Sequence, residues 1–456
     1  MSTVDKLQEI VGQDWVITNR EQMERYLADE TADAVRPKPA DNVILVKPKS
    51  AEEIAAILKM ANREKIPVFV RGGGTGICGG AIPIADGILV SMERLDRIDE
   101  VDRDNLMVVA EAGVPFGNML KAVEEAGLFF PPHPGDEGAH VGGLVACNAG
   151  GTRAVKYGVI RNFVRGLEVV LPTGEIITTG GKLLKNNQGF DLMHLFINSG
   201  GALGVITKVI FRLCPKLNSS GTLVVSYDSR HKAIGTVPQI LQSGIIPMAI
   251  EYVERDVIEL SARRLSMTWP ATKGQAYLIV ILTGDSEDEL YSQGERVSDI
   301  CEQNSAVDIL IAERREEQAN ILKIRSEIYG SLKPRVADVL DITVPPASIG
   351  AMMDRIDEIA KRYDVKIPTY GHAADGNLHP HLMVDLVKKG ILREVKRTIY
   401  QEAVKLGGVI TGEHGLGVIR LADLDLCPDG KTWELMRGIK RVFDPNDILS
   451  PGIGVR

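Results

Sequence analysis

Cysteine is scarce in this sequence, and no two cysteines are placed to work together. The five are widely spaced and never form a Cys-x-x-Cys pair: Cys78, Cys147, Cys214, Cys301 and Cys427. Disulfide frameworks and iron–sulfur clusters both need cysteines in even sets with a recognisable spacing. We therefore expect reduced thiols, no iron–sulfur cluster ligated by this chain, and a cytoplasmic protein.

Long apolar runs and an excess of positive charge are also missing. No run reaches the roughly 18 apolar residues of a membrane-spanning helix, and residues 1–6 have neither the basic nor the apolar region of a signal peptide. The 53 basic residues are outnumbered by 61 acidic ones, for a net charge of −8. This balance argues against nucleic acid as a partner. The sequence predicts no transmembrane segment and leaves peripheral contact with a membrane open.

What the sequence does have is length, and glycine in its first half. Its 456 residues allow two or three domains with sizeable cores. Up to about Leu213 glycine clusters interrupt short apolar strands, and beyond it strands alternate with amphipathic helices. This change predicts a separate α+β second domain, built on an antiparallel sheet with helices on one side.

The first domain is expected to begin with a β-α-β unit. Apolar runs predict strands at 43–46 and 67–70. Between them Ser50 can cap a helix, and Glu53 occupies the third helical position of a capping box. In the second domain we expect strands at 276–282 and 341–345, and helices after Asp285, around 352–359 and at 433–442.

The second strand leads into a loop with four glycines in five positions, Gly72 to Gly76. Glycine lets successive N–H groups converge on an anion, and Arg71 and Thr75 offer a charge and a hydroxyl. The loop lacks the Gly-Lys-Ser/Thr of a Walker motif. Residues 77–83 do not resemble the opening turn of a helix, which argues against a Rossmann fingerprint. A flexible surface loop is the alternative.

Two further glycine-rich stretches lie at 131–158 and 199–204. The second precedes an apolar strand at 205–210, and a hairpin is predicted between the two stretches, over 167–179. Glycine between apolar residues suits backbone that packs against a large flat ligand. Three such stretches within 210 residues favour a nucleotide cofactor, although each alone has an ordinary turn-and-strand explanation.

The second domain carries a group of histidines between glycines. His372 and His379 flank the turn signal Asp375-Gly376. A hairpin would bring the two histidines opposite each other, with β-carbons about 5 Å apart. Glu413 and His414 follow in a second glycine-rich stretch. Three nitrogen and oxygen ligands and one spare base suit a metal centre with an open position.

These stretches, in this order, resemble the FAD domain of the vanillyl-alcohol oxidase/PCMH superfamily. The His372 and Glu413 segments narrow the resemblance to FAD-linked 2-hydroxy acid dehydrogenases, a family with an FAD-linked oxidase C-terminal domain. Its members include D-lactate dehydrogenases, the catalytic subunit of glycolate oxidase and D-2-hydroxyglutarate dehydrogenase. The resemblance covers residues 38–456.

The resemblance implies an α+β fold with a defined division of the chain. A helical lead-in at 1–37 would precede a two-part PCMH-type FAD-binding domain at 38–215. An α+β substrate or cap domain with an antiparallel sheet would occupy 216–415, and a helical segment at 416–456 would return to the FAD domain. Some relatives bind flavin covalently through a histidine in the first glycine loop. Thr75 lies there in this chain, so FAD is expected to be non-covalent.

The residues expected to contact FAD come from all three glycine-rich stretches. They are Arg71, Gly72, Gly73, Gly74, Thr75, Gly76, Pro134, Gly135, Asp136, Gly142, Gly143, Asn148, Gly150, Tyr157, Gly158, Gly204, Val205 and Ile206.

The family motif His-x-Gly-Asp-Gly-Asn-x-His matches residues 372–379, with Ala374 in place of the first glycine. By this match His372, His379 and Glu413 correspond to ligands of a divalent metal, and His414 to the catalytic base. Nitrogen and oxygen ligands allow Zn, Mn or Fe. Asn377 would contact the substrate or support a ligand.

The resemblance also implies how the substrate is held. Arg325 matches the family's carboxylate-binding arginine, and without the family it would read as an exposed helix arginine. Some relatives carry a second basic residue where this chain has Val339. Its absence favours D-lactate, then glycolate, over D-2-hydroxyglutarate, although Lys333 or Arg335 could compensate.

The expected reaction is oxidation of a small D-2-hydroxy acid to the 2-oxo acid. Hydride would pass to flavin N5 and the hydroxyl proton to His414, since histidine titrates near neutral pH. Electrons would leave to an electron-transferring flavoprotein, an iron–sulfur subunit or a quinone, and a homo-oligomer or larger complex is expected.

Two other functions remain open from the sequence. A zinc hydrolase would use the same histidines but leave the glycine loops without a role. A flavin electron-transfer subunit would have no substrate chemistry of its own.

Overall fold

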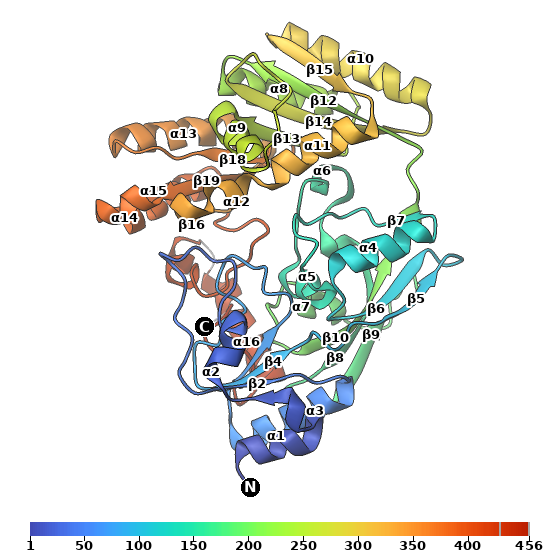
Figure 1. Ribbon diagram of the computed structural model, residues 1–456, viewed down its shortest axis with the longest axis vertical. Coiled ribbons are helices and arrows are strands. Elements are labelled where there is room, and N and C mark those ends of the chain that lie inside the picture. The colour runs from blue at the N-terminus through green and yellow to red at the C-terminus, as the bar shows by residue number, and fades with distance from the viewer. Residues whose placement is uncertain (428–429, 455–456) are drawn as a thin grey trace.

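The computed structural model describes residues 1–427 and 430–454 and arranges them in two bodies, one above the other (Figure 1). The lower body contains the glycine-rich half of the chain. The chain enters the upper body after β11 (Cys214–Pro215) and leaves it after α15 (Leu392–Lys405).

The first sheet of the lower body has the strand order β1-β2-β4-β3, with β2 and β3 parallel to β4. The predicted β-α-β unit is present, and Ser50 caps α3 by accepting the N–H of Glu53. The Glu53 carboxylate accepts from the N–H of Lys49 instead of Ser50. β4 lies between the two predicted strands and was not predicted. The elements are α1 (Thr3–Val11), β1 (Val16–Ile17), α2 (Arg20–Met23), β2 (Val43–Val46), α3 (Ala51–Glu64), β3 (Val68–Arg71) and β4 (Gly87–Ser91).

The second sheet of the lower body is antiparallel, in the order β5-β6-β10-β8-β9. It shares one apolar core with the first sheet. The predicted hairpin and the strand after the third glycine stretch are confirmed as β8, β9 and β10. The elements are β5 (Ile98–Asp102), β6 (Met107–Glu111), α4 (Phe116–Glu125), β7 (Leu128–Phe129), α5 (Val141–Cys147), α6 (Ala154–Tyr157), β8 (Val164–Val170), β9 (Ile176–Gly180), α7 (Met193–Phe196) and β10 (Val205–Arg212).

The upper body is built on an eight-stranded sheet in the order β15-β12-β14-β13-β18-β19-β16, with β17 also paired to β19. All of its pairs are antiparallel, as predicted. The strand expected over 341–345 is shorter, since only Ile342–Thr343 pairs as β17. The strands are β12 (Ser219–Tyr227), β13 (Ala249–Glu254), β14 (Ala276–Gly284), β15 (Asp308–Ala312), β16 (Val336–Val339), β17, β18 (Thr369–His372) and β19 (Asn377–Met383).

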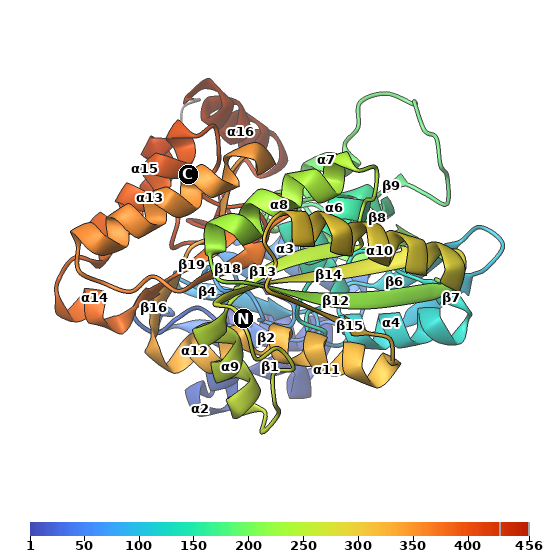
Figure 2. The same ribbon diagram turned by 90° about the horizontal axis from the view of Figure 1, so that it is seen from above.

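Helices cover both faces of this sheet, so the expectation of helices on one side was wrong (Figure 2). The cause is visible in β14, where consecutive residues 276–282 are all buried. A strand that is apolar at every position must bury both faces. One face contacts α8 (Arg230–Gln242), α10 (Glu287–Gln303), α13 (Ile349–Arg362) and α15, and the other contacts α9 (Arg255–Arg264), α11 (Arg315–Ser326) and α12 (Ile328–Leu332).

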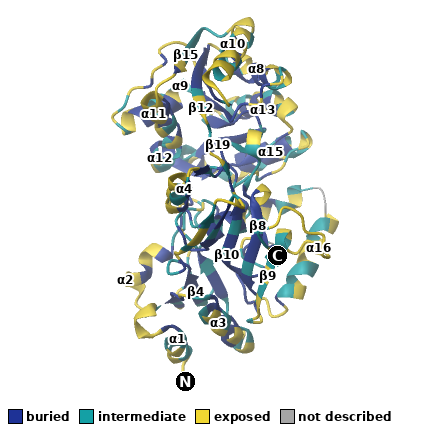
Figure 3. Ribbon diagram, turned by 90° about the vertical axis from the view of Figure 1, so that its right-hand side faces the viewer, coloured by how far each residue is buried: buried dark blue, intermediate teal, exposed yellow. Residues whose placement is uncertain are grey.

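The final residues run back to the lower body after α14 (Val384–Lys388) and α15. α16 (Gly430–Phe443) contacts it through Phe443, whose ring lies 5.4 Å from that of Phe196. Beyond α16 the chain pairs with the free edge of β3, where Ser450 N–H donates to Val68 O at 2.8 Å. Figure 3 shows buried residues following the strands of both bodies, while the outer helix faces are exposed. Among the described residues, no helix is both long and apolar enough to span a bilayer.

Candidate active site

The two histidines of the predicted hairpin lie on neighbouring strands, but they are not directly opposite each other. β18 and β19 pair Tyr370 with His379 and His372 with Asn377. The predicted pairing of His372 with His379 is therefore wrong. The turn contains four residues, 373–376, so His372 pairs with Asn377, two positions before His379. Gly376 has φ +85°, and a β-carbon there would lie 2.0 Å from Val344 O. The histidines are therefore diagonal neighbours, with ring centroids 5.3 Å apart.

Strand alternation places the polar residues of this hairpin on one face of the sheet. Tyr370 and His372 on β18 share that face with Asn377 and His379 on β19, because side chains two apart on a strand point the same way. Glu251 on β13 pairs across with His372 and adds a carboxylate to the same face.

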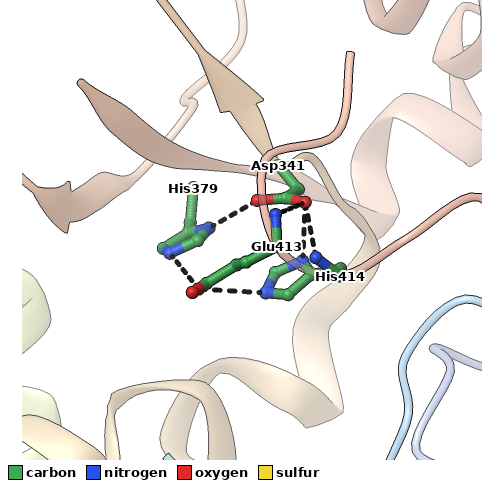
Figure 4. Close-up of side chains that lie close together, drawn as sticks. All are labelled: Asp341, His379, Glu413 and His414. Atoms are coloured by element: carbon green, nitrogen blue, oxygen red, sulfur yellow. Dashed lines mark hydrogen bonds and ion pairs between the residues drawn. The ribbon is translucent and has the colours of Figure 1, made fainter. Parts of the chain in front are cut away.

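Glu413, which comes from the loop after α15, contacts both predicted histidine ligands of the hairpin. Its Oε1 lies 3.3 Å from Nε2 of His372 and 3.4 Å from Nε2 of His379. Nε2 of His414 is 3.7 Å from the same oxygen, and its ring stacks on His379 at 5.0 Å (Figure 4). The structure thus gathers all four residues that the sequence singled out, with the three histidines around one oxygen of Glu413.

Asp341 holds the loop that carries Glu413 and His414. Its Oδ2 accepts from the backbone N–H groups of Gly412, Glu413 and His414 at 2.8–2.9 Å, and from the Thr411 hydroxyl at 2.8 Å. Oδ1 accepts from the Asn377 amide at 3.0 Å. Donor atoms of Asp341, His379, Glu413 and His414 lie within 4.8 Å of one another. These hydrogen bonds show that Asp341 holds the loop, and its carboxylate is also one of the groups placed to hold a metal ion.

Charges in this buried group are strongly interdependent. Burial disfavours the imidazolium of His372, yet Glu251 and Glu413 raise its pKa well above the ordinary value. Burial likewise opposes ionisation of Glu413, but His372 and His379 lower its pKa to about 2. Burial and the neighbouring imidazoles hold the pKa of His379 well below its ordinary range. The site therefore stabilises a carboxylate at Glu413 facing one cationic position, and a divalent metal fits this donor set.

Arg325 lies at this site and not on the solvent side of its helix. It is 8% exposed and comes from the last turn of α11. Its Nη2 is 2.5 Å from Oε2 of Glu251, and its guanidinium stacks over Tyr370 at 4.7 Å. Asn377 is buried, and its amide donates to Asp341, Ile342 O and Thr343 Oγ1. Asn377 therefore supports the loop that carries Glu413 and His414 through its hydrogen bond to Asp341.

The first two glycine-rich stretches come together in the lower body. A β-carbon on Gly72 would lie 3.3 Å from His140 Cβ and 3.8 Å from Gly143 Cα, and one on Gly73 would lie 2.5 Å from Gly138 O. Arg71 donates to the backbone carbonyls of Arg25 and Ala28, so its side chain joins the start of the first glycine loop to the N-terminal segment. No atom lies within 4 Å of the β-carbon position at Gly76, Gly135 or Gly143. Close backbone contact on one side and open space on the other fits a flat cofactor.

The other predicted FAD residues lie around this region or in the second sheet. Asp136 Oδ1 accepts from Gly138 N, Asn148 Oδ1 accepts from Arg161 N, and Gly158 makes a turn at φ +79°. Tyr157 ends α6, and its ring lies 6.1 Å from Phe129. Gly204 directly precedes β10, and Val205 and Ile206 begin that strand and pair with Val170 and Val169.

The first glycine loop and the Glu413 loop are in direct contact. The Cys78 thiol donates to His414 O at 3.2 Å, and Val418 N–H donates to Cys78 O at 2.9 Å. A β-carbon on Gly150 would lie 2.3 Å from Oε2 of Glu413. The metal-type site of the upper body therefore faces the glycine loops of the lower body.

Sequence reasoning missed Glu251 and the role of Asp341. Both are fully buried carboxylates that interrupt apolar stretches, at Ala249-Ile250-Glu251-Tyr252-Val253 and at Val339-Leu340-Asp341-Ile342. A charged residue inside a buried strand requires a partner. That pattern was the available signal, but it does not say which partner.

Comparison with known proteins agrees with this arrangement. Residues 43–180 match a family model described as an FAD binding domain, and residues 216–453 match one for FAD linked oxidases, C-terminal domain. A D-lactate dehydrogenase of Archaeoglobus fulgidus is 42% identical over 432 residues, covering 94% of this chain and 95% of that protein. The glycolate oxidase subunit GlcD of Bacillus subtilis is 36% identical over 415 residues, covering 90% and 88%. Substrate-bound p-cresol methylhydroxylase has the same fold, with a TM-score of 0.78 at 17% identity over 99% of this chain and 96% of that one.

The fold and the two family matches together define a two-domain flavoprotein. The chain belongs to the FAD-linked oxidase family and is an oxidoreductase.

Proposed function

We propose that this protein is an FAD- and divalent-metal-dependent dehydrogenase that oxidises a small D-2-hydroxy acid to the 2-oxo acid. D-lactate is the preferred substrate and glycolate the next. One observation carries the proposal: Glu413 Oε1 lies within 3.7 Å of the Nε2 atoms of three histidines, beside the glycine loops. The similarity to D-lactate dehydrogenase and glycolate oxidase subunits supports the substrate class.

In the proposed reaction, different side chains bind the metal, accept the proton and bind the substrate carboxylate. Bound FAD supplies a hydride acceptor, and a bound metal supplies a Lewis acid for the substrate hydroxyl. His372, His379 and Glu413 hold the metal, which is Zn, Mn or Fe. His414 accepts the hydroxyl proton from its place stacked on His379. Arg325 holds the substrate carboxylate, since a guanidinium offers paired donors in a plane.

FAD is held non-covalently, chiefly by the backbone of residues 72–76 and 138–143. Thr75 provides no ring nitrogen for a covalent bond. The close contact of Gly72 and Gly73 with residues 138–143 supports this assignment.

The surroundings of Val339 favour a substrate with one carboxylate. Val339 is 5% exposed on β16 and offers no charge. Lys333, which could have replaced a basic residue there, pairs with Glu30 on the surface. D-2-hydroxyglutarate, which carries a second carboxylate, is therefore the alternative substrate, ranked after D-lactate and glycolate.

Electrons leave to a separate acceptor. The described residues contain no paired cysteines for an iron–sulfur cluster. We propose an electron-transferring flavoprotein, an iron–sulfur subunit or a quinone as the acceptor, within an oligomer or larger complex.

Anaerobic reduction of the flavin tests the proposal. The purified protein should absorb near 450 nm as flavoproteins do, and D-lactate should bleach that band. L-lactate should not, and D-2-hydroxyglutarate should do so more slowly. The His414→Ala variant should keep its flavin and lose bleaching by about 10²–10⁴-fold. A protein that no 2-hydroxy acid bleaches, or a His414→Ala variant that bleaches at the normal rate, would refute the proposal.

A further inference from the structure

Glu251 is a fully buried carboxylate with a partner at each oxygen. It lies in the middle of β13 and is 0% exposed. Its Oε1 is 2.6 Å from Nδ1 of His372, and its Oε2 is 2.5 Å from Nη2 of Arg325. The two partners come from different elements, since His372 ends β18 and Arg325 is in the last turn of α11.

The cost of this burial indicates a purpose beyond stability. A carboxylate withdrawn from water is tolerated only when its charge and lone pairs are satisfied. The neighbouring positions of β13, Ile250 and Tyr252, face the apolar core on the other side of the sheet. An apolar residue at position 251 would fit a sheet of this kind, but it would leave His372 and Arg325 without their shared partner.

The contact with His372 selects which ring nitrogen faces the metal site. A histidine that donates Nδ1–H to a carboxylate presents the lone pair of Nε2 to a metal, and such partners fix the ring's orientation. Nε2 of His372 is the atom that lies 3.3 Å from Glu413. Glu251 therefore holds His372 in the tautomer and the orientation that metal binding needs.

The contact with Arg325 leaves that side chain partly available. A guanidinium has five N–H donors. Nη2 of Arg325 forms an ion pair with Oε2 of Glu251, a contact without hydrogen-bond geometry. Arg325 Nε is buried and has no hydrogen-bond partner. An unpaired donor at a residue that is 8% exposed is suited to an anionic ligand at this site.

We propose that Glu251 is a positioning residue that couples the metal to the substrate carboxylate. One oxygen orients a metal ligand and the other fixes the guanidinium that binds the carboxylate, so the two halves of a 2-hydroxy acid are held at a set separation. This inference rests on the proposed function, which requires both the metal and Arg325.

Glu251→Gln tests the coupling with little change in shape. An amide can satisfy one partner at a time, because its NH₂ group cannot accept from either His372 or Arg325. We expect metal affinity to fall about 10–100-fold, as for other partners of metal-bound histidine. Zinc or manganese bound after dialysis against defined free concentrations gives this value without any assay of activity. At saturating metal, KM for D-lactate should rise by a factor of about ten or more.

Two further variants complete the experiment. Glu254 lies on the same strand and pairs with Arg230 away from the site. The Glu254→Gln variant is therefore the control, and its metal affinity and KM should match those of the wild type. Arg325→Met should raise KM and leave metal affinity unchanged. FAD content and thermal unfolding verify that each variant is folded.

The outcomes separate the inference from the function on which it rests. Wild-type metal affinity or wild-type KM in a folded Glu251→Gln protein overturns the coupling while the proposed function stands. A wild-type protein that binds none of zinc, manganese and iron(II) overturns the proposed function itself. A loss of affinity in Glu254→Gln equal to that in Glu251→Gln also overturns the coupling, because it would indicate a general effect on the strand.

Discussion

Gly150, in the lower body, lies directly against Glu413 of the candidate metal site. A β-carbon there would lie 2.3 Å from Oε2 and 2.8 Å from Cβ of Glu413. Its φ is not positive, so alanine is compatible with the backbone itself. Glycine is therefore needed at this position to leave room for Glu413, and not because of the backbone conformation.

Gly150→Ala should displace Glu413 from the three histidines. Misplacement of a ligand by about 1 Å can cost about 10²-fold in rate, and we expect a loss of this size in turnover, together with weaker metal binding. Metal titration and anaerobic flavin reduction measure the two effects. Gly235→Ala, on α8 with open space around it, is the control and should be neutral or slightly stabilising. Normal metal affinity in Gly150→Ala would contradict the arrangement described here.

At the level of residues, the sequence predicted the groups that lie in local patterns. His372, His379, Glu413 and His414 stand between glycines and could be identified from that setting. Glu251 could not, because its partners His372 and Arg325 become neighbours only when β13, β18 and α11 assemble. The diagonal placement of His372 and His379 depended on a turn length that Asp375-Gly376 alone does not determine.

Among the elements, the loop at 411–415 depends on one carboxylate. Asp341 Oδ2 accepts from three consecutive backbone N–H groups, so the loop curls around a single oxygen. Cys78 and Arg420 also contact this loop, through His414 O and Gly415 O. The positions of Glu413 and His414 nevertheless depend strongly on one aspartate, which supplies the acceptor for three N–H groups in a row.

Asp341→Asn should loosen this loop without changing the fold. The variant replaces a charge with a neutral group of the same size and removes charge-assisted hydrogen bonds, each worth about 1.5–3 kcal/mol. Hydrogen exchange of the peptide spanning residues 411–418 should become faster, and metal affinity should fall. Thr411→Val removes one donor and keeps the three N–H bonds, so it should show a smaller change. Unchanged exchange in Asp341→Asn would show that other contacts hold the loop.

The elements themselves were predicted unevenly. Strands and helices with clear boundaries, such as β2 and α3 with its Ser50 cap, follow from local chemistry. β4 was missed although 87–91 is apolar, because it follows a glycine-rich loop with no regular spacing. Helices on the second face of the upper sheet follow from the continuous apolar run in β14, which the sequence contained and which was interpreted only as a strand.

For the whole molecule, Arg420 joins the tail to the upper sheet. It is 0% exposed and donates to Gly415 O at 3.0 Å and to Val339 O at 3.1 Å. Burial opposes its charge, but Tyr400 and Asp341 raise its pKa above the ordinary value. The side chain thus ties the loop that carries His414 to β16.

Arg420→Met should destabilise the protein by several kcal/mol, since buried groups left without a partner cost about 1–3 kcal/mol each. Denaturant unfolding of the FAD-loaded protein measures the change. Arg355→Met is the control, because Arg355 pairs with Glu358 on an exposed face of α13, where an ion pair is worth about 0–1 kcal/mol. Equal stability of the two variants would exclude a structural role for Arg420.

The pairing of residues 448–450 with β3 has a consequence for how the protein is made. Val68 donates to Ile448 O and accepts from Ser450, so one edge of the first sheet is completed by residues synthesised long after β3 itself. While the ribosome is still translating the upper body, that edge is an unpaired strand, the kind of surface at which nascent chains aggregate. The contacts of Cys78 with His414 and Val418 have the same long separation in sequence. Contacts of such large sequence separation form late and slow folding, so the reactive site is assembled only after residues of both bodies have been synthesised.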